Sequence, residues 1–511
     1  MRAWGLGAWW LHPDEGIYLL LASTEKPEIF WAGIRENAHP PVYYLLLRAF
    51  AGVTTNFVAL RILSLVSGVA VVLGVAFFAG AIVGGSARTR RVTGLLAGLL
   101  VALSPGFVVL SQVLRPYALL VACQMFSAFF LARYFVTRSP GNLAGFSLLA
   151  CLAILVHYSG VLALGAAGLA LAAELLERRS GSRELVDGAL ALIMPAALFG
   201  ALYFSHVRPQ LVESGMQAEV FQGWLGPFLI DSPRDVVPRL LGVMSLLFGR
   251  ELAGVGTILT LAGLVLAVIT RRLSLAAWTL GALAIAIVAS AAGRYPLGWS
   301  RHSAWLLGPL AVLPCYALAL ALTRGARLAA LCGAAVLGMA ALAGPIDALL
   351  GVPPPVAKLS EQRVGREDVA RVIEWLGASG HPTPLLVSDS VYLQLIPDFG
   401  LPSEFWPGQS FWVVPRFRWQ GYEVFKADVW DFRLARDLRG EADDLRRYIE
   451  RIDSRAGGAK LANAPRITML VDDPTPEFRR LLRDGSGPAT EVLCVAKLCV
   501  FELDLASLLA R

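Results

Sequence analysis

An acidic pair near the start of the chain, Asp14 and Glu15, leads into strongly apolar sequence. Charged side chains at membrane depth are costly, so they tend to persist where they have a partner or a chemical task. One interpretation is a solvated loop or the first turn of a helix, where acidic side chains are common. The alternative is catalysis, with Asp14 as the general base and Glu15 orienting or binding an acceptor. Together with the outer polar residues below, the pair favours catalysis.

A histidine followed by two prolines, His39-Pro40-Pro41, stands shortly after this pair. The sequence after it, VYYLLLR, is typical of an amphipathic helix at the membrane interface, with Tyr43 and Tyr44 at the headgroup level. In that interpretation the prolines give the helix a stiff entry. Alternatively, His39 donates a hydrogen bond to a substrate. Both interpretations stay open on the sequence alone.

Two arginines are embedded in apolar sequence, Arg61 in ALRILSLVSG and Arg115 in SQVLRPYALL. Long basic side chains often reach out of the membrane toward lipid headgroups, which would account for both. A guanidinium also matches a phosphate group bidentately, so either arginine could bind the phosphate of a lipid-linked substrate. Arg115 is the stronger candidate because Ser111, Gln112 and Tyr117 form a polar cluster around it.

Further polar residues stand at the ends of other apolar runs. His157 closes one run, where a lone histidine is more often a structural group than a catalyst. Arg301 and His302 precede a late run, and they suit either an anion site or an interface anchor. No cysteine or histidine spacing indicates a zinc or iron–sulfur site, so no metal ligands are predicted.

The composition predicts a polytopic α-helical membrane protein. Of 511 residues, 56% are hydrophobic and 16% are charged, whereas soluble domains carry about 25% charged residues. The mean hydropathy is +0.61. Apolar runs near the ~20-residue spanning length indicate about ten spans, at roughly 56–84, 92–111, 116–137, 142–157, 160–176, 185–204, 252–270, 273–292, 303–322 and 328–349.

The distribution of charge predicts the orientation of these spans. The net charge is +7, and the basic residues form short clusters between apolar runs, not a nucleic-acid-binding face. Five of these clusters fall on alternate loops, which the positive-inside rule makes cytoplasmic. The outer side of the cytoplasmic (inner) membrane then carries the first outer loop, 1–55, and all the candidate residues above. It also carries the chain after about residue 350.

The composition changes after Gly351, which divides the chain into a transmembrane domain, 1–351, and an extracytoplasmic α/β domain, 352–511. Helical and strand patterns alternate in the second domain, with an aromatic loop at 402–420. Cys494 and Cys499 would face each other, and could form a disulfide, if the two residues 496–497 make a hairpin turn. A continuous strand would instead place the two thiols on opposite faces.

The ordered motifs resemble glycosyltransferase family 39, within the C-type glycosyltransferase superfamily. These proteins include the dolichyl-phosphate-mannose protein mannosyltransferases and the lipid A aminoarabinose transferases. The resemblance covers essentially the whole chain. Its motifs are DE at 14–15, HPPVYYLLL at 39–47, ALRILS at 59–64, SQVLRPYALL at 111–120, HY at 157–158, and Arg294-Tyr295 and Arg301-His302 near the start of a late helix.

The resemblance implies transfer of a sugar, with inversion, from a polyprenyl-phosphate donor to a hydroxyl of a protein or glycolipid on the outer membrane face. Asp14 with Glu15 would deprotonate or orient the acceptor. Residues that would bind substrate are His39, Tyr44, Arg61, Arg115, Tyr117, His157, Arg301 and His302. The lipid-phosphate sugar is a co-substrate, no nucleotide sugar or further cofactor is implied, and a need for a divalent metal stays open. Membrane lipids are partners, and nucleic acid is not.

Two departures from the family pattern stand out. Val113 occupies a position where family members often have Glu, and the chain starts at the acidic loop, where the family normally has a preceding transmembrane helix. We therefore expect a missing first helix. Two other functions would also fit a polytopic membrane protein: a transporter or flippase of lipid-linked glycans, and a non-catalytic receptor or scaffold. The first predicts ionisable residues at mid-membrane depth and repeated halves, and the second relies on the aromatic loop as a binding surface.

Overall fold

The structure is a computed structural model. It describes residues 9–37, 39–177, 181–209, 226–323, 364–378, 384–388, 416–420, 422–426, 464–472, 490–495 and 498–504, and single residues or short groups at 3, 6–7, 333, 391–392, 395, 397, 449 and 452.

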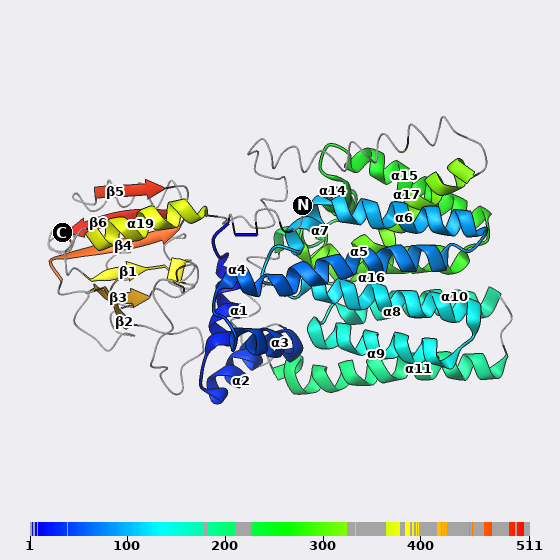
Figure 1. Cartoon of the computed structure of the whole chain (residues 1–511), viewed down its shortest axis with the longest axis horizontal. Coiled ribbons are helices and arrows are strands. Elements are labelled where there is room, and N and C mark those ends of the chain that lie inside the picture. Colours follow the sequence, from blue (N-terminus) through cyan, green and yellow to red (C-terminus); the bar gives the residue numbers. More distant parts are fainter. Residues whose placement is uncertain are drawn as a thin grey trace. The chain divides into compact units, whose positions relative to one another are not determined.

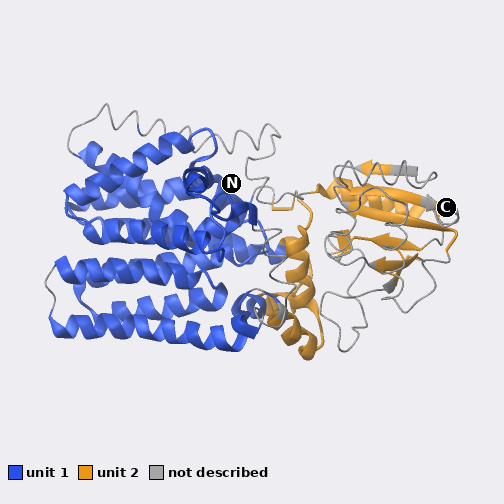
Figure 2. Ribbon diagram, turned by 180° about the vertical axis from the view of Figure 1, so that it is seen from behind, with its two compact units in different colours: residues 1–4, 37–46, 59–359 blue, residues 5–36, 47–58, 360–511 orange. Residues whose placement is uncertain are grey.

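The chain forms two compact units (Figure 2). Unit 1 consists of residues 1–4, 37–46 and 59–359, and unit 2 of residues 5–36, 47–58 and 360–511. The predicted domain boundary at 351–352 lies outside the described residues, so it stays a prediction.

Unit 1 is a bundle of helices (Figure 1). Its helices are α5 (Ile62–Ile82), α6 (Ala87–Leu103), α7 (Pro105–Leu110), α8 (Tyr117–Thr137), α9 (Pro140–Val156), α10 (Gly160–Glu177), α11 (Ser182–Leu202), η1 (Tyr203–Val207), η2 (Gly226–Phe228), η3 (Pro233–Asp235), α14 (Val236–Phe248), α15 (Ala253–Ile269), α16 (Leu273–Ala291), η4 (Arg301–Ser303) and α17 (Ala304–Thr323). Two helices, α3 (Pro41–Ala51) and α4 (Phe57–Leu60), contain residues of both units.

The prediction of a polytopic helical membrane protein is confirmed. Within the described residues, six helices are long and apolar enough to cross a membrane: Phe57–Ile82, Tyr117–Thr137, Gly160–Glu177, Ser182–Val207, Leu273–Ala291 and Arg301–Thr323. The pair Pro233–Phe248 and Ala253–Ile269, bent by 96°, would add a seventh. Helices α6 and α9 have 17 residues each, and the last predicted span, 328–349, lies almost wholly outside the described residues. The number of spans therefore stays a prediction.

Glycines let the helices of unit 1 approach closely. A Cβ atom on Gly263 of α15 would lie 2.1 Å from the carbonyl oxygen of Leu313 in α17, and one on Gly308 would lie 2.3 Å from Sδ of Met125 in α8. Membrane helices gain little from excluding lipid, so they associate largely through close packing of small residues. The backbone contact at Gly263 therefore fixes how α15 lies on α17.

Unit 2 begins with α1 (Pro13–Ser23) and α2 (Pro27–Glu36), so the predicted first outer loop is largely helical. Arg48 of α3 holds these helices together. Its Nη1 donates to the carbonyl oxygen of Thr24 at 2.6 Å, and its guanidinium carbon lies 4.6 Å from the ring centroid of Phe30. The arginine thereby satisfies an unpaired carbonyl group after the last turn of α1.

The rest of unit 2 contains a six-stranded mixed sheet, in the order β2-β3-β1-β4-β6-β5 (Figure 1). The strands are β1 (Leu385–Val387), β2 (Arg416–Trp419), β3 (Tyr422–Lys426), β4 (Arg466–Asp472), β5 (Thr490–Val495) and β6 (Leu498–Asp504). β1 is parallel to both β3 and β4, and the other pairs are antiparallel. Because β1 is central and its residues are buried, its apolar run has no polar alternation.

Helix α19 (Arg366–Ala378) buries Val369, Val372 and Leu376. This spacing presents one apolar stripe, which is typical of an amphipathic helix. The sequence has two further helical patterns in this region. The pattern at 442–454 lies almost entirely outside the described residues, and the pattern at 476–484 lies wholly outside them.

Two hairpins complete the sheet. Cys494 and Cys499 are directly paired across β5 and β6 and form a disulfide, as the hairpin interpretation requires. The hairpin of β2 and β3 is not predicted, because 416–419 falls in the aromatic loop. Gln420 in its two-residue connection has a φ of 43°. That left-handed conformation favours Gly, Asn or Asp, so a glutamine there is only a weak turn signal.

We expect Gly263→Ala to lower the unfolding temperature of the detergent-purified protein. The added methyl group must displace the backbone of α17, and such overpacking costs about 1–3 kcal/mol. Gly254 lies on the same helix, and a Cβ atom there would meet nothing within 4 Å. Gly254→Ala should leave the unfolding temperature unchanged or raise it slightly. Equal losses in both variants would contradict the close approach of α15 and α17.

Candidate functional site

Four segments of unit 1 bring polar side chains together where helices begin or end. His39 precedes α3, and Arg115 lies between α7 and α8. His157 ends α9, and Arg301 and His302 open the short helix η4 before α17. Each position lies next to a helix terminus, where the last turn leaves backbone groups unpaired and polar side chains are tolerated.

Tyr117, at the start of α8, is the centre of this cluster. Its ring centroid lies 5.0 Å from that of His157, 5.6 Å from that of His302 and 6.5 Å from that of His39. The rings of His39 and His157 are 4.9 Å apart. Tyr117 Oη also lies 3.4 Å from Nδ1 of His302. We call these residues, with Arg115 and Arg301, the histidine–arginine cluster.

Two guanidinium groups give this cluster its positive charge. Arg115 is 6% exposed, and its guanidinium carbon lies 5.8 Å from the Tyr117 ring centroid. Its backbone carbonyl accepts a hydrogen bond from Ser64 Oγ of α5 at 3.5 Å. Arg301 is partly buried in η4. Both charges act on the buried His157, and a cation attracts an anion more strongly where the dielectric is reduced.

Burial and the two arginines keep the buried histidines neutral. Burial lowers the pKa of His157 from 6.5 to about 3, with the charges of Arg115 and Arg301 acting in the same direction. The pKa of His39 is also well below its usual value, chiefly through burial, with contributions from His157, Arg115, His302 and Arg301. Removal from water and nearby positive charge both disfavour the imidazolium form. The histidines therefore offer hydrogen bonds without adding charge.

Ser159 and Tyr295 belong to the same region, although neither was among the predicted site residues. Ser159 Oγ lies 2.8 Å from Nδ1 of His157, and Tyr295 Oη donates to the backbone carbonyl of His302 at 2.8 Å. Burial raises the pKa of Tyr295. Tyr295 follows an arginine within one of the family motifs, which was a usable signal. A serine two residues after a histidine carries no signal by itself.

Arg61 and Tyr44 are buried in unit 1, at the start of α5 and in α3. Among the described residues, the ring contacts around Tyr117 include neither of them. Residues near them are connected to the cluster by hydrogen bonds. Tyr43 Oη lies 3.4 Å from Ser64 Oγ, and Ser64 Oγ donates to the backbone carbonyl of Arg115. A role for Arg61 and Tyr44 in binding substrate stays a prediction.

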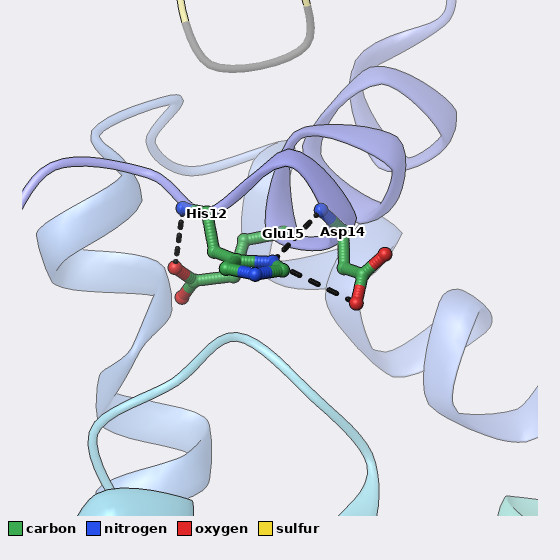
Figure 3. Close-up of polar contacts among 3 residues, drawn as sticks. All are labelled: His12, Asp14 and Glu15. Carbon is green, nitrogen blue, oxygen red and sulfur yellow. Dashed lines mark hydrogen bonds and ion pairs between the residues drawn. The ribbon is translucent and has the colours of Figure 1, made fainter. Parts of the chain in front are cut away.

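Asp14 and Glu15 lie in unit 2, in the first turn of α1 (Figure 3). The Glu15 carboxylate accepts the backbone N–H of His12 at 2.9 Å, and His12 Nδ1 accepts the N–H of Asp14 at 3.1 Å. This reciprocal pairing is a capping box, in which His12 takes the place of the usual Ser or Thr. Glu15 is 1% exposed. Its carboxylate therefore has a structural task, as the helix-start interpretation requires.

Asp14 differs from its neighbour. Its carboxylate is 3.6 Å from Nδ1 of His12, and its side chain is 16% exposed. Because Nδ1 already accepts a hydrogen bond from the Asp14 N–H group, it carries no proton to share with the carboxylate. The catalytic roles predicted for Asp14 and Glu15 stay predictions.

A small cavity lies inside the unit 1 bundle, between α8, α9, α10, α16 and α17. Gln124 and Trp305 are among its few polar residues, and the centre of a water molecule can occupy about 20 Å³ of it. That volume suits about one water molecule, so a lipid-linked sugar would not fit there. Among the described residues, no group of three or more His, Cys, Asp or Glu side chains could hold a metal ion.

Comparison with known proteins gives one partial family match and several matches to solved structures. Residues 38–203 match the family model described as dolichyl-phosphate-mannose-protein mannosyltransferase. ArnT from Cupriavidus metallidurans bound to undecaprenyl phosphate superposes with a TM-score of 0.55 and 16% identity, over 99% of this chain and 96% of ArnT. The apo state of the same ArnT superposes with a TM-score of 0.52 and 14% identity, over the same shares of the two chains. No curated protein matches the chain.

An oligosaccharyltransferase from Archaeoglobus fulgidus, in complex with Zn and sulfate, superposes with a TM-score of 0.50 and 12% identity. The match covers 94% of this chain and 66% of that protein. These similarities show that the chain has the fold of ArnT and of this oligosaccharyltransferase, a fold of multi-pass membrane proteins. With the family match at 38–203, they confirm the resemblance seen in the ordered motifs.

The neutral histidines predict that acid destabilises the fold. Between pH 6.5 and about 3, His157 binds a proton in the unfolded chain but not in the folded one. The contribution of His157 to the free energy of unfolding is therefore complete above pH 6.5. It declines as the pH falls, by about 2 kcal/mol at pH 5. His157→Gln should show a smaller drop in unfolding temperature from pH 7 to pH 5 than the wild type. Identical drops would contradict a neutral His157.

Proposed function

We propose that this protein is a membrane glycosyltransferase. It transfers a sugar, with inversion, from a polyprenyl-phosphate donor to a hydroxyl of a protein or glycolipid. The observation that carries the proposal is the histidine–arginine cluster. Two arginines and three histidines from four separate segments gather at helix termini, in a chain with the fold of ArnT.

The cluster suits a phosphate group better than a neutral sugar. Arg115 and Arg301 supply two positive charges, and guanidinium groups bind phosphate bidentately. His39 and His157 are neutral, so they can donate hydrogen bonds without increasing the repulsion between the cations. ArnT, which shares the fold, binds undecaprenyl phosphate. A lipid-linked phosphate is therefore the anion that we assign to this cluster.

In the proposed reaction, the acceptor hydroxyl oxygen forms a bond to the anomeric carbon of the sugar. The bond between that carbon and the phosphate oxygen breaks, and the phosphate leaves with the electron pair. Negative charge grows on the phosphate as the bond breaks, so fixed cations stabilise the transition state more than the ground state. Arg115, Arg301 and His302 would supply this stabilisation.

Asp14 is the proposed general base that takes the hydroxyl proton. Glu15 is assigned to holding α1 through its bond to the His12 N–H group, with a secondary part in orienting the acceptor. His39, Tyr44, Arg61, Tyr117 and His157 would line the donor site. We place the reaction on the outer face of the cytoplasmic membrane, with residues 352–511 extracytoplasmic, because the cytoplasmic loops carry the basic clusters.

Loss of Arg115 should weaken lipid-phosphate binding. Removing a charge-assisted hydrogen bond costs about 1.5–3 kcal/mol, so Arg115→Ala should bind undecaprenyl phosphate about 10- to 100-fold more weakly. Binding can be measured by native mass spectrometry of the purified protein in detergent. Undecaprenol, which lacks the phosphate, should bind both proteins equally.

Arg133 provides the matched control for Arg115. It lies near the other end of α8 and is exposed, so Arg133→Ala should bind undecaprenyl phosphate as the wild type does. If Arg115→Ala and Arg133→Ala bind undecaprenyl phosphate equally, Arg115 does not contact the phosphate.

Asp14→Asn should abolish transfer while preserving the fold. Loss of a general base typically reduces the rate about 10²- to 10⁴-fold. The measurement is mass analysis of envelope glycans and glycoproteins from cells that lack the gene and carry each variant. Glu15→Gln keeps an oxygen that accepts the His12 N–H, so it should retain α1 and most of the activity. Full activity of Asp14→Asn would remove Asp14 as the base.

A further inference from the structure

The ring of His157 is fixed by the residue two positions later. Its Nδ1 atom lies 3.1 Å from the backbone N of Ser159 and 2.8 Å from Ser159 Oγ, and both residues are buried. A backbone N–H group can only donate, so Nδ1 must accept. A neutral imidazole carries one proton, and that proton therefore sits on Nε2.

The same turn occurs elsewhere in the chain. His12 Nδ1 accepts the N–H of Asp14 at 3.1 Å, again two residues later. That histidine caps the start of α1, whereas His157 lies between the end of α9 and the start of α10. His157 thus uses its Nδ1 for a local backbone bond, and the two ring nitrogens point in different directions. The Nε2–H group is consequently turned away from Ser159.

The rest of the His157 ring is enclosed by the histidine–arginine cluster. Its neighbours are the rings of His39 and Tyr117, at 4.9 and 5.0 Å, and that of His302 at 6.4 Å. The charges acting on it are those of Arg115 and Arg301. The donor therefore belongs to the same cluster as the two cations that would hold an anion.

The hydroxyl of Ser159 has a single proton. Because Nδ1 of His157 carries no proton, Ser159 Oγ donates its proton in the 2.8 Å contact with Nδ1. An alanine would keep the Ser159 N–H bond but lose this bond from the hydroxyl.

We propose that Ser159 is a positioning residue, which holds His157 in the Nε2–H tautomer and makes it a hydrogen-bond donor to a phosphate oxygen. The inference rests on the proposed function only for the identity of that acceptor. It excludes His157 as a general base in the proposed transfer, because its Nδ1 lone pair is used by Ser159 and its Nε2 carries the proton. Its role is to share the charge that develops on the leaving phosphate.

Nitrogen-15 NMR of the histidine-labelled, detergent-purified full chain tests the tautomer directly. The chain has only six histidines, so His157→Gln identifies the His157 signals by their loss. We expect one neutral form, with Nε2 protonated and Nδ1 unprotonated, in the absence of any ligand. A protonated Nδ1 in the wild type, in either the other tautomer or an imidazolium, would overturn the inference.

Ser159 variants separate positioning from packing. Ser159→Ala should shift the Nδ1 signal toward that of a less hydrogen-bonded nitrogen and weaken undecaprenyl phosphate binding several-fold. Ser159→Thr keeps the hydroxyl and should restore both properties toward the wild type. If the alanine variant retains its unfolding temperature and shows neither change, Ser159 does not position His157.

Addition of undecaprenyl phosphate to the labelled wild type tests the donor role. We expect the Nε2 signal of His157 to shift as the lipid binds, while undecaprenol produces no such shift. Bound lipid with an unchanged Nε2 signal would overturn the donor role. If the wild type fails to bind undecaprenyl phosphate at all, the proposed function fails together with the phosphate acceptor, whereas the tautomer is decided by the ligand-free spectrum.

Discussion

Positive charge enclosed by helix termini is the constraint on which this site depends. Arg115 is nearly inaccessible to solvent, and its charge and that of Arg301 act on the same buried histidine. His39 and His157 remain neutral beside these charges, so they add none of their own. The proposed ligand is a phosphate, and because it gains negative charge during the reaction, fixed cations would stabilise it most in the transition state.

The helix bundle supplies the rigidity that this arrangement needs. Contacts such as Gly263 against Leu313 bring helix backbones close together, which leaves little freedom for the helices to slide. The cluster residues lie at the termini of these helices, so their separations are fixed by the packing of whole helices. A site assembled from loops alone would hold two like charges together less firmly.

The sequence predicted the class and most of the helices well, because few soluble folds contain so many long apolar runs. The predicted topology also placed four polar residues on the outer side of the membrane: Arg115, His157, Arg301 and His302. In the structure all four lie near enough to His39 to affect its pKa, and the rings of His157 and His302 are in contact. Sequence could not reveal Ser159, since its role depends on the angle at which one turn presents a hydroxyl. The β2–β3 hairpin was missed because Gln420 is a poor signal for a turn.

The two acidic residues at the start of the chain show how neighbouring side chains can acquire different tasks. They are adjacent in sequence, so composition and spacing could not separate them. The helix does so, because successive residues point about 100° apart around its axis. Glu15 is turned back toward the His12 N–H group and is buried, whereas Asp14 remains partly exposed. A carboxylate used in a helix cap is poorly suited to receive a substrate proton. That geometry favours Asp14 over Glu15 as the base.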